Sequence, residues 1–183
     1  GNANACTGKV GYQNTKRILS ALSRKLYCST DEILIMSTGI IGRQLPIDKI
    51  AHSISNSDFN SHCNLKSAAS AIMTTDKYPK YLTKSYMLGR KKIRFRGLCK
   101  GAGMIQPNMA TTLGYIFTDA DISNDVLKKL LKKNIENTFN AISCDGDTST
   151  NDMISIFATG KAKNSSIQSI NDKKLKAFDE SLN

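Results

Sequence analysis

A β-hairpin near the middle of the chain constrains the fold most strongly. The segments 81–88 and 91–98 flank the dipeptide Gly89-Arg90, and a loop of two residues makes the flanking strands antiparallel neighbours. Within the second segment, Ile93 and Phe95 alternate with charged residues, which is typical of a strand with one buried face. Any fold of this chain must therefore contain an antiparallel pair of strands that covers a core on one side.

Helical and extended patterns alternate along the rest of the chain. Apolar spacing and capping residues predict helices at 14–27, 46–54, 64–73 and 123–139, and another from about residue 171. Short apolar runs predict further strands at 31–36, 111–117 and 153–158. This mixture favours an α/β or α+β sandwich with a mixed sheet.

The chain of 183 residues carries a formal net charge of +11, which would suit nucleic acid or another anionic surface. The lysines are scattered, however, and gather only into short basic runs such as 90–92, 128–129 and 132–133. No nucleic-acid module signature accompanies them. A lysine-rich solvated surface is the simpler interpretation, and a basic nucleic-acid-binding module is kept as the non-enzyme alternative.

The sequence contains no pattern typical of a metal site, a disulfide framework or a membrane span. Its five cysteines form no CxxC pair, which favours free thiols in a reducing compartment. The acidic loop 145–152 fails as an EF-hand, because the fifth, sixth and twelfth positions are Ser149, Thr150 and Ile156. No apolar run approaches the ~20 residues of a transmembrane helix. We therefore expect no metal, no cofactor and no membrane association.

Thr111 lies where a glycine-rich loop leads into a predicted strand. Its hydroxyl could attack the carbonyl of Ala110, shift the chain to an ester and let water cut it. The freed Thr111 would then own a hydroxyl and an α-amine of pKa ~8 that can serve as its base. Taken alone, Ala-Thr-Thr is more typical of β-branched residues that open a strand.

Five strings of residues point to one family when they are taken in order. They are Lys-Gly-x-Gly-Met-Ile-x-Pro-Asn-Met-Ala-Thr at 100–111, Gly-Asn-Ala-Asn-Ala-Cys-Thr-Gly at 1–8, Ser-Thr-Gly-Ile-Ile-Gly at 37–42, Ala-Ile-Met-Thr-Thr-Asp at 71–76 and Asp-Gly-Asp-Thr-Ser-Thr-Asn-Asp at 145–152. Together they resemble the ornithine acetyltransferase family, the bifunctional enzymes of arginine biosynthesis. The sequence departs from the family's common residues at Ala102, Thr112 and Lys77.

The resemblance implies a layered α/β fold, with sheets between helices and a site of the N-terminal-nucleophile type. It implies an acyltransferase that moves an acetyl group from N-acetylornithine to glutamate through an acetyl-threonine intermediate, after self-cleavage between Ala110 and Thr111. A turn at a strand end can aim a hydroxyl and a backbone N–H at an oxyanion. The family roles then fall on Thr111 as nucleophile, Thr38 and Gly39 as oxyanion hole, and Lys100, Thr74 and Thr111 as substrate-binding residues, with Thr75 left open in place of Thr74.

The resemblance also implies how the chain is organised. Residues 1–183 would form one partial catalytic domain, in which 1–110 ends the α chain and 111–183 begins the β chain. The chain opens without methionine and inside a matching string, so we expect a fragment that holds half of a substrate pocket. Two α and two β chains would assemble in the bacterial cytoplasm or the mitochondrial matrix.

Two questions of activity stay open at the level of the sequence. Some members of the family also use acetyl-CoA as the acetyl donor, and no residue here decides whether this chain does. A related self-processing aminopeptidase would use the same nucleophile but hydrolyse peptides. Acceleration of N-acetylornithine turnover by glutamate would separate the transferase from the aminopeptidase.

Overall fold

The computed structural model describes residues 1–61, 64–103, 105, 112–147 and 149–182, and the predicted hairpin lies at the edge of its sheet. Strand β1 (Lys80–Leu88) pairs antiparallel with β2 (Lys91–Lys100). Gly89 in the turn has a φ of +60°, a left-handed conformation that glycine adopts without strain. The hairpin prediction is confirmed.

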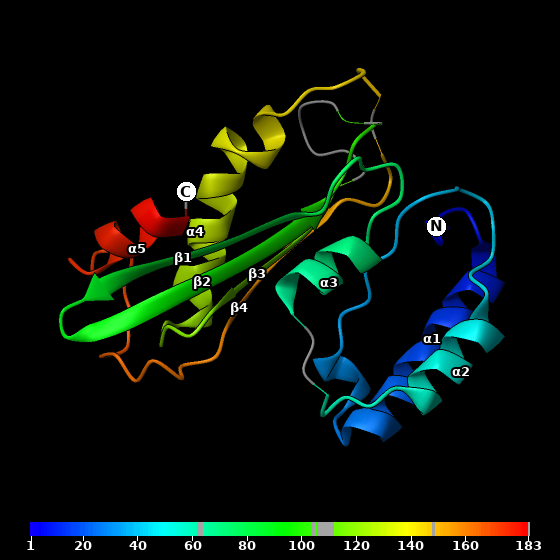
Figure 1. Ribbon diagram of the computed structural model, residues 1–183, viewed down its shortest axis with the longest axis horizontal. Helices are drawn as coiled ribbons and strands as arrows, with labels where there is room; N and C mark the ends of the chain where they lie inside the picture. The colour runs from blue at the N-terminus through cyan, green and yellow to red at the C-terminus, as the bar shows by residue number, and fades with distance from the viewer. Residues whose placement is uncertain (62–63, 104, 106–111, 148, 183) are drawn as a thin grey trace. The chain divides into compact units, whose positions relative to one another are not determined.

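The sheet continues from the hairpin in the order β1-β2-β3-β4 (Figure 1). Strand β3 (Leu113–Thr118) is antiparallel to β2, whereas β4 (Met153–Ala158) runs parallel to β3. Parallel neighbours need a long crossover connection. Here the crossover contains helix α4 (Asn124–Asn137) and the short 3-10 helix η2 (Phe139–Ala141). The sheet is therefore mixed, as the sequence predicts.

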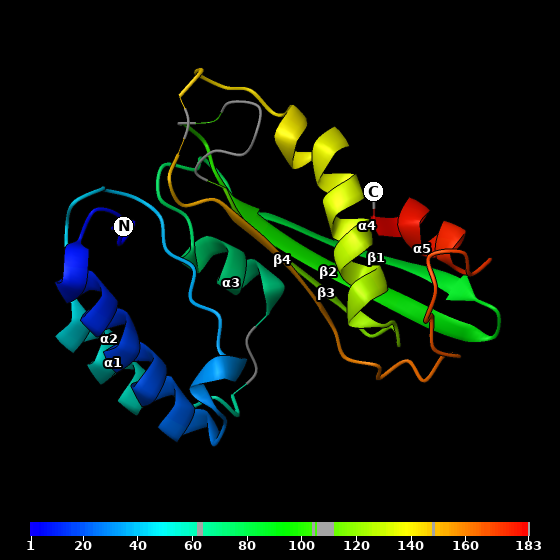
Figure 2. The same ribbon diagram turned by 180° about the vertical axis from the view of Figure 1, so that it is seen from behind.

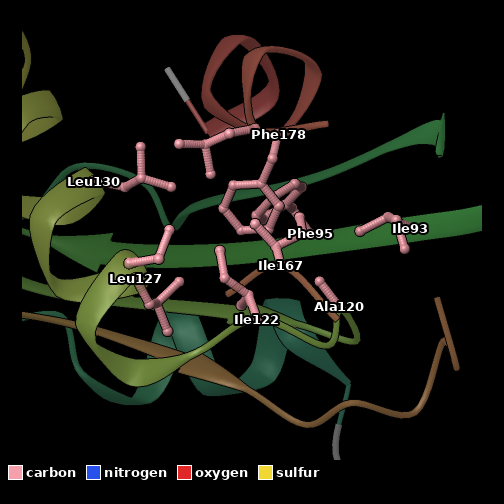
Figure 3. Packing of buried hydrophobic residues seen from close by; sticks show 10 residues of the cluster. Ile93, Phe95, Ala120, Ile122, Leu127, Leu130, Ile167 and Phe178 are labelled. Atoms are coloured by element: carbon pink, nitrogen blue, oxygen red, sulfur yellow. The ribbon is translucent and has the colours of Figure 1, made fainter. Parts of the chain in front are cut away.

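Helices α4 and α5 (Leu175–Leu182) lie on the same face of the sheet, as Figure 2 shows from behind. Ser123 begins α4 as predicted, because its hydroxyl accepts a hydrogen bond from the N–H of Val126 at 3.4 Å. Phe178 of α5 meets Phe95 of β2 edge to face, with ring centroids 4.9 Å apart. Figure 3 shows the cluster that fills this layer: Ile93, Phe95, Ala120, Ile122, Val126, Leu127, Leu130, Ile167, Leu175 and Phe178.

The described chain divides into two compact units, Gly1–Asn64 and Leu65–Asn183. The second unit contains the sheet, α4, α5 and helix α3 (Leu65–Ala71), which contacts β1 and β2. The first unit pairs α1 (Gly8–Leu26) with α2 (Ile47–Asn56). Its small core is formed by Ile18, Ile47 and Ile54.

Two predictions in the first unit are wrong. The predicted strand 31–36 begins as a 3-10 helix, η1 (Thr30–Glu32), and continues without strand pairing among the described residues. Extended apolar residues form a strand only where a neighbour accepts their backbone hydrogen bonds, and Leu34 is 63% exposed. Helix α1 begins at Gly8, after Thr7 at the N-cap position, rather than near residue 14. Thr15 lies inside the helix, where its hydroxyl donates back to the carbonyl of Gly11.

The α+β fold class, with a mixed sheet packed against helices, is confirmed. Cys6, Cys28, Cys99 and Cys144 are free thiols. Within the residues that the structure describes, no group of three or more His, Cys, Asp and Glu side chains could hold a metal ion. In the same part of the chain, no helix combines the length and apolarity that crossing a membrane demands.

Candidate functional site

The candidate site lies at the end of the sheet where β2 stops and where β3 and β4 begin. Lys100 pairs with Leu113 across the antiparallel strands, and Leu113 pairs with Met153 across the parallel ones. These three residues therefore form one row across three strands. The residues that flank this row, Gly101, Thr112 and Asp152, follow or precede the strands on the same edge.

Lys100 is a charged side chain in a buried place. It is 2% exposed, and its Nζ donates to the hydroxyl Oγ1 of Thr74 at 3.4 Å. Burial lowers the pKa of Lys100, while the charges of Asp76 and Asp152 oppose that shift and the charge of Lys80 adds to it. Desolvation therefore disfavours the charged form of Lys100, and two carboxylates from different segments favour it.

Asp76 anchors this side of the site through a network of hydrogen bonds. Its side chain is 1% exposed and forms an ion pair with Lys80. Its carboxylate also accepts from the backbone N–H of Gly101 at 2.9 Å and from that of Thr74 at 3.4 Å. Desolvation alone would raise the pKa of Asp76, but these donors and the Lys80 charge outweigh it and lower the pKa. Asp76 thus stays ionised and fixes the backbone of Thr74 and of Gly101, the residue after Lys100.

Residues 152 and 153 hold the backbone of Thr112 on the other side of the row. The N–H of Thr112 donates to Oδ1 of Asp152 at 2.5 Å, and its carbonyl accepts from the N–H of Met153 at 3.0 Å. Burial raises the pKa of Asp152, although the Thr112 N–H and the charge of Lys100 act against the rise. The start of β3 is therefore tied to β4 by a carboxylate that also interacts with Lys100.

The acidic loop makes a similar attachment at Ile105. Oδ1 of Asp145 accepts from the N–H of Ile105 at 2.8 Å, and the carbonyl of Ile105 accepts from the N–H of Cys144 at 2.8 Å. Residues 144–153 thus bind the two backbone polar groups of Ile105 and the two of Thr112. This loop is therefore hydrogen-bonded to both residues.

Thr38 and Gly39 belong to the first unit. Thr38 is 6% exposed, and Gly39 has a φ of +132°. A Cβ at Gly39 would lie 2.0 Å from the carbonyl oxygen of Gly1, which accepts from the N–H of Ile40 at 2.9 Å. The strings 1–8 and 37–42 therefore lie against each other, and their close approach requires glycine at position 39.

The structure places the predicted site residues in different ways. It brings Thr74 and Lys100 together, and this hydrogen bond favours Thr74 over Thr75 as the partner of Lys100. It describes Thr38 and Gly39 in the other unit, and Ala110 and Thr111 lie outside the described residues. The roles of all these residues remain predictions.

Sequence reasoning did not identify Asp76, Lys80 and Asp152 as individual members of the site. Asp76 and Lys80 are four residues apart and form an ion pair, but residues 73–79 are not helical, so the pairing rule for charges on a helix face does not account for this contact. Asp152 lies 40 residues from Thr112 along the chain. Only the parallel pairing of β3 with β4 brings them together, so no local pattern could have revealed the contact.

Comparison with known proteins supplies the family. The sequence model of the ArgJ family matches residues 1–183. The chain is 46% identical over 182 residues to the arginine biosynthesis bifunctional protein ArgJ, mitochondrial, of Dictyostelium discoideum, covering 100% of this chain and 41% of that protein. It is 45% identical over 172 residues to the arginine biosynthesis bifunctional protein ArgJ of Thermotoga neapolitana, covering 94% of this chain and 43% of the relative.

A solved structure agrees with these relatives. The crystal structure of the arginine biosynthesis bifunctional protein ArgJ from Bacillus halodurans superposes with a TM-score of 0.53 at 31% identity, covering 60% of this chain and 58% of that one. The chain spans less than half the length of the two curated relatives. Because the family's sequence model matches it from the first residue to the last, the chain belongs to the ArgJ family.

Proposed function

We propose that this chain is part of an acyltransferase that moves an acetyl group from N-acetylornithine to glutamate. The observation that carries the proposal is the arrangement at the start of β3. There Asp152 binds the N–H of Thr112, and Lys100 on the neighbouring strand β2 donates to Thr74. The residue before Thr112 in the sequence is the candidate nucleophile, Thr111. The relatives are named as bifunctional proteins of arginine biosynthesis, which agrees with this chemistry.

The first step is self-cleavage between Ala110 and Thr111. The Thr111 hydroxyl attacks the carbonyl carbon of Ala110, and the peptide nitrogen leaves as the α-amine of Thr111 while an ester forms. Water then hydrolyses the ester. This produces a carboxylate at Ala110 and a free threonine at position 111, whose amine can accept the proton of its own hydroxyl.

The second step is ping-pong acetyl transfer. The Thr111 oxygen attacks the acetyl carbonyl of N-acetylornithine, its proton passes to the α-amine, and ornithine leaves with that proton on its nitrogen. The amine of glutamate then attacks the acetyl-threonine ester and restores the Thr111 hydroxyl. Thr38 and Gly39 would stabilise the negative oxygen in both tetrahedral intermediates.

Lys100 and Thr74 supply the recognition of substrate in this proposal. Both substrates carry a carboxylate, and an ammonium with a neighbouring hydroxyl is a suitable pair of donors for it. Lys100 is 2% exposed whereas Thr74 is on the surface. The substrate carboxylate would therefore approach from the Thr74 side and displace the contact between Thr74 and Lys100.

The proposal is tested by analysing the natural full-length protein by mass spectrometry and N-terminal sequencing. We expect a new N-terminus at Thr111, an intact and inactive Thr111→Ala variant, and a Thr111→Ser variant that is still cut. An active wild-type protein without a terminus at Thr111 would exclude the mechanism. Glutamate should accelerate turnover of N-acetylornithine, which a self-processing aminopeptidase would not show.

The second activity and the assembly belong to the same proposal. Replacing N-acetylornithine by acetyl-CoA in the assay determines whether the protein also acetylates glutamate from that donor. The cleaved α and β chains are proposed to remain together as two copies of each, which a native mass measurement would count. One relative is a bacterial protein and another is named as mitochondrial. The proposed location is therefore the bacterial cytoplasm or the mitochondrial matrix.

A further inference from the structure

Two aspartates of the loop 144–153 lie at either end of the segment that contains the proposed cleavage site, but their surroundings differ. Asp145 is exposed and binds the N–H of Ile105. Asp152 is partly buried, binds the N–H of Thr112 and directly precedes β4. Asp152 therefore differs from Asp145 in binding the residue that directly precedes β3 and in interacting with the buried ammonium of Lys100.

The backbone of Thr112 is fixed at both of its polar groups by two consecutive residues. Asp152 accepts from its N–H, and Met153 donates to its carbonyl at 3.0 Å. The carbonyl bond belongs to the parallel register in which Leu113 faces Met153. The bond from the Thr112 N–H to the Asp152 side chain adds a second attachment between the residue before β3 and the residue before β4.

The same carboxylate acts on Lys100. Lys100 of β2 pairs with Leu113 on one side of β3, and Met153, the residue after Asp152, pairs with Leu113 on the other side. The charged groups that act on Lys100 are Asp76, Asp152 and Lys80. Asp76 already forms an ion pair with Lys80 and accepts from the N–H groups of Gly101 and Thr74. Among the residues that the structure describes, Lys100 is the cation whose charge lowers the pKa of Asp152.

We propose that Asp152 is a positioning residue, whose carboxylate orients Thr112 at the start of β3 by a hydrogen bond and keeps Lys100 charged across the strand. This inference rests on the proposed function, in which the residue before Thr112 is the nucleophile and Lys100 binds a substrate carboxylate. The two effects are separable, because an amide oxygen can accept the hydrogen bond but cannot supply the charge.

Two variants of Asp152 separate the two effects in the natural full-length protein. Asp152→Asn keeps an acceptor for the Thr112 N–H and removes the negative charge. We expect it to be cut at a rate close to wild type, while the alkaline limb of the pH profile of substrate KM moves to lower pH, because Lys100 loses its proton more easily. Asp152→Ala removes both effects and should slow cleavage on the order of tenfold or more, the loss typical of a hydrogen bond to a charged group.

The matched control is Asp147→Asn, which makes the same chemical change at an exposed position of the same loop. It should leave both the cleavage rate and the pH profile as in the wild type. Wild-type cleavage by Asp152→Ala, or an unmoved pH profile in Asp152→Asn, would overturn the inference.

Amide hydrogen exchange keeps the inference testable apart from the proposed function. Exchange at the Thr112 N–H should be faster in Asp152→Ala than in Asp152→Asn, whether or not the protein is cut. Equal exchange in the two variants would refute the positioning role of Asp152. Absence of cleavage and acetyl transfer in the wild type, combined with the expected exchange difference, would instead refute the proposed function.

Discussion

At the residue scale, two lysines interact with the same buried carboxylate and should respond differently to removal of their charge. Lys80 forms the ion pair with Asp76, so Lys80→Met leaves a buried carboxylate without its cation and should destabilise the protein by about 2–3 kcal/mol. Burial lowers the pKa of Lys100, which means that its charged form is less favourable in the folded state than in the unfolded one. Lys100→Met should therefore leave stability unchanged or raise it, while it abolishes acetyl transfer.

Urea denaturation of the two variants at pH 7 measures this difference. The comparison is well matched, because both changes replace an ammonium by a thioether of similar length. A Lys100→Met variant that lost as much stability as Lys80→Met would show that Lys100 is a structural cation and would count against its role in substrate binding.

Gly39 makes a second prediction at this scale. Gly39→Ala combines a backbone φ of +132° with a Cβ 2.0 Å from the carbonyl oxygen of Gly1, so the segments 1–3 and 38–40 would have to separate. We expect a loss of about 1–3 kcal/mol from the strained backbone alone. Gly97→Ala is the control, since the nearest atom to its Cβ is 3.9 Å away. Equal unfolding midpoints for the two variants would contradict the close approach at Gly39.

Thr38 is tested by kinetics rather than by stability. If its hydroxyl is an oxyanion donor, Thr38→Ala should lower kcat by about 10²–10³-fold with little change in KM. Steady-state assays on the natural full-length protein measure both constants. An effect confined to KM would assign Thr38 to substrate binding instead.

At the element scale, helix α5 depends on one aromatic contact with the sheet. Phe178 is completely buried and meets Phe95 edge to face, so Phe178→Ala should cost about 3–5 kcal/mol through lost burial and an unfilled cavity. Lys176→Ala on the same helix is the control, because that side chain is 84% exposed and such changes stay within about 0.5 kcal/mol. Thermal unfolding of both variants gives the comparison, and a small effect at Phe178 would mean that α5 is not part of the cooperative core.

The elements that could be predicted from sequence are those whose signals are local. The hairpin has its turn dipeptide, α4 has the Ser123 cap, and β4 is a short apolar run; each was predicted and each is observed. The strand expected at 31–36 was wrong because a strand depends on a neighbour, which no local pattern supplies. The site follows the same division: Lys100 and Thr74 were found from family strings, whereas the contact from Asp152 to Thr112 exists only through strand pairing.

At the scale of the whole molecule, three buried or partly buried carboxylates predict how the stability of the second unit responds to acid. The pKa values of Asp76 and Asp179 are lowered from 3.8, because hydrogen bonds and lysine charges outweigh desolvation. Each therefore contributes stability that is present above pH ~4 and is lost as the pH falls through the lower folded value. Burial raises the pKa of Asp152. This group therefore acts in the opposite direction, because its protonation favours the folded state.

Free energies of unfolding measured from pH 6 down to pH 2.5 test this balance. The wild type should lose stability below pH ~4, and Asp152→Asn should lose it more steeply because the opposing contribution of Asp152 is gone. A variant curve that runs parallel to the wild type would mean that Asp152 titrates alike in the folded and unfolded states.

The parallel pairing of β3 with β4 has a consequence for when the protein can mature. The partners of Thr112 come 40 residues later in the sequence, and contacts of such separation form late because a long loop must close first. On the ribosome, the start of β3 emerges well before Asp152 and Met153 have been synthesised. A cleavage that depends on Asp152 would therefore not occur in the nascent chain until β4 has paired with β3. A cut protein would then be one in which the sheet had already formed.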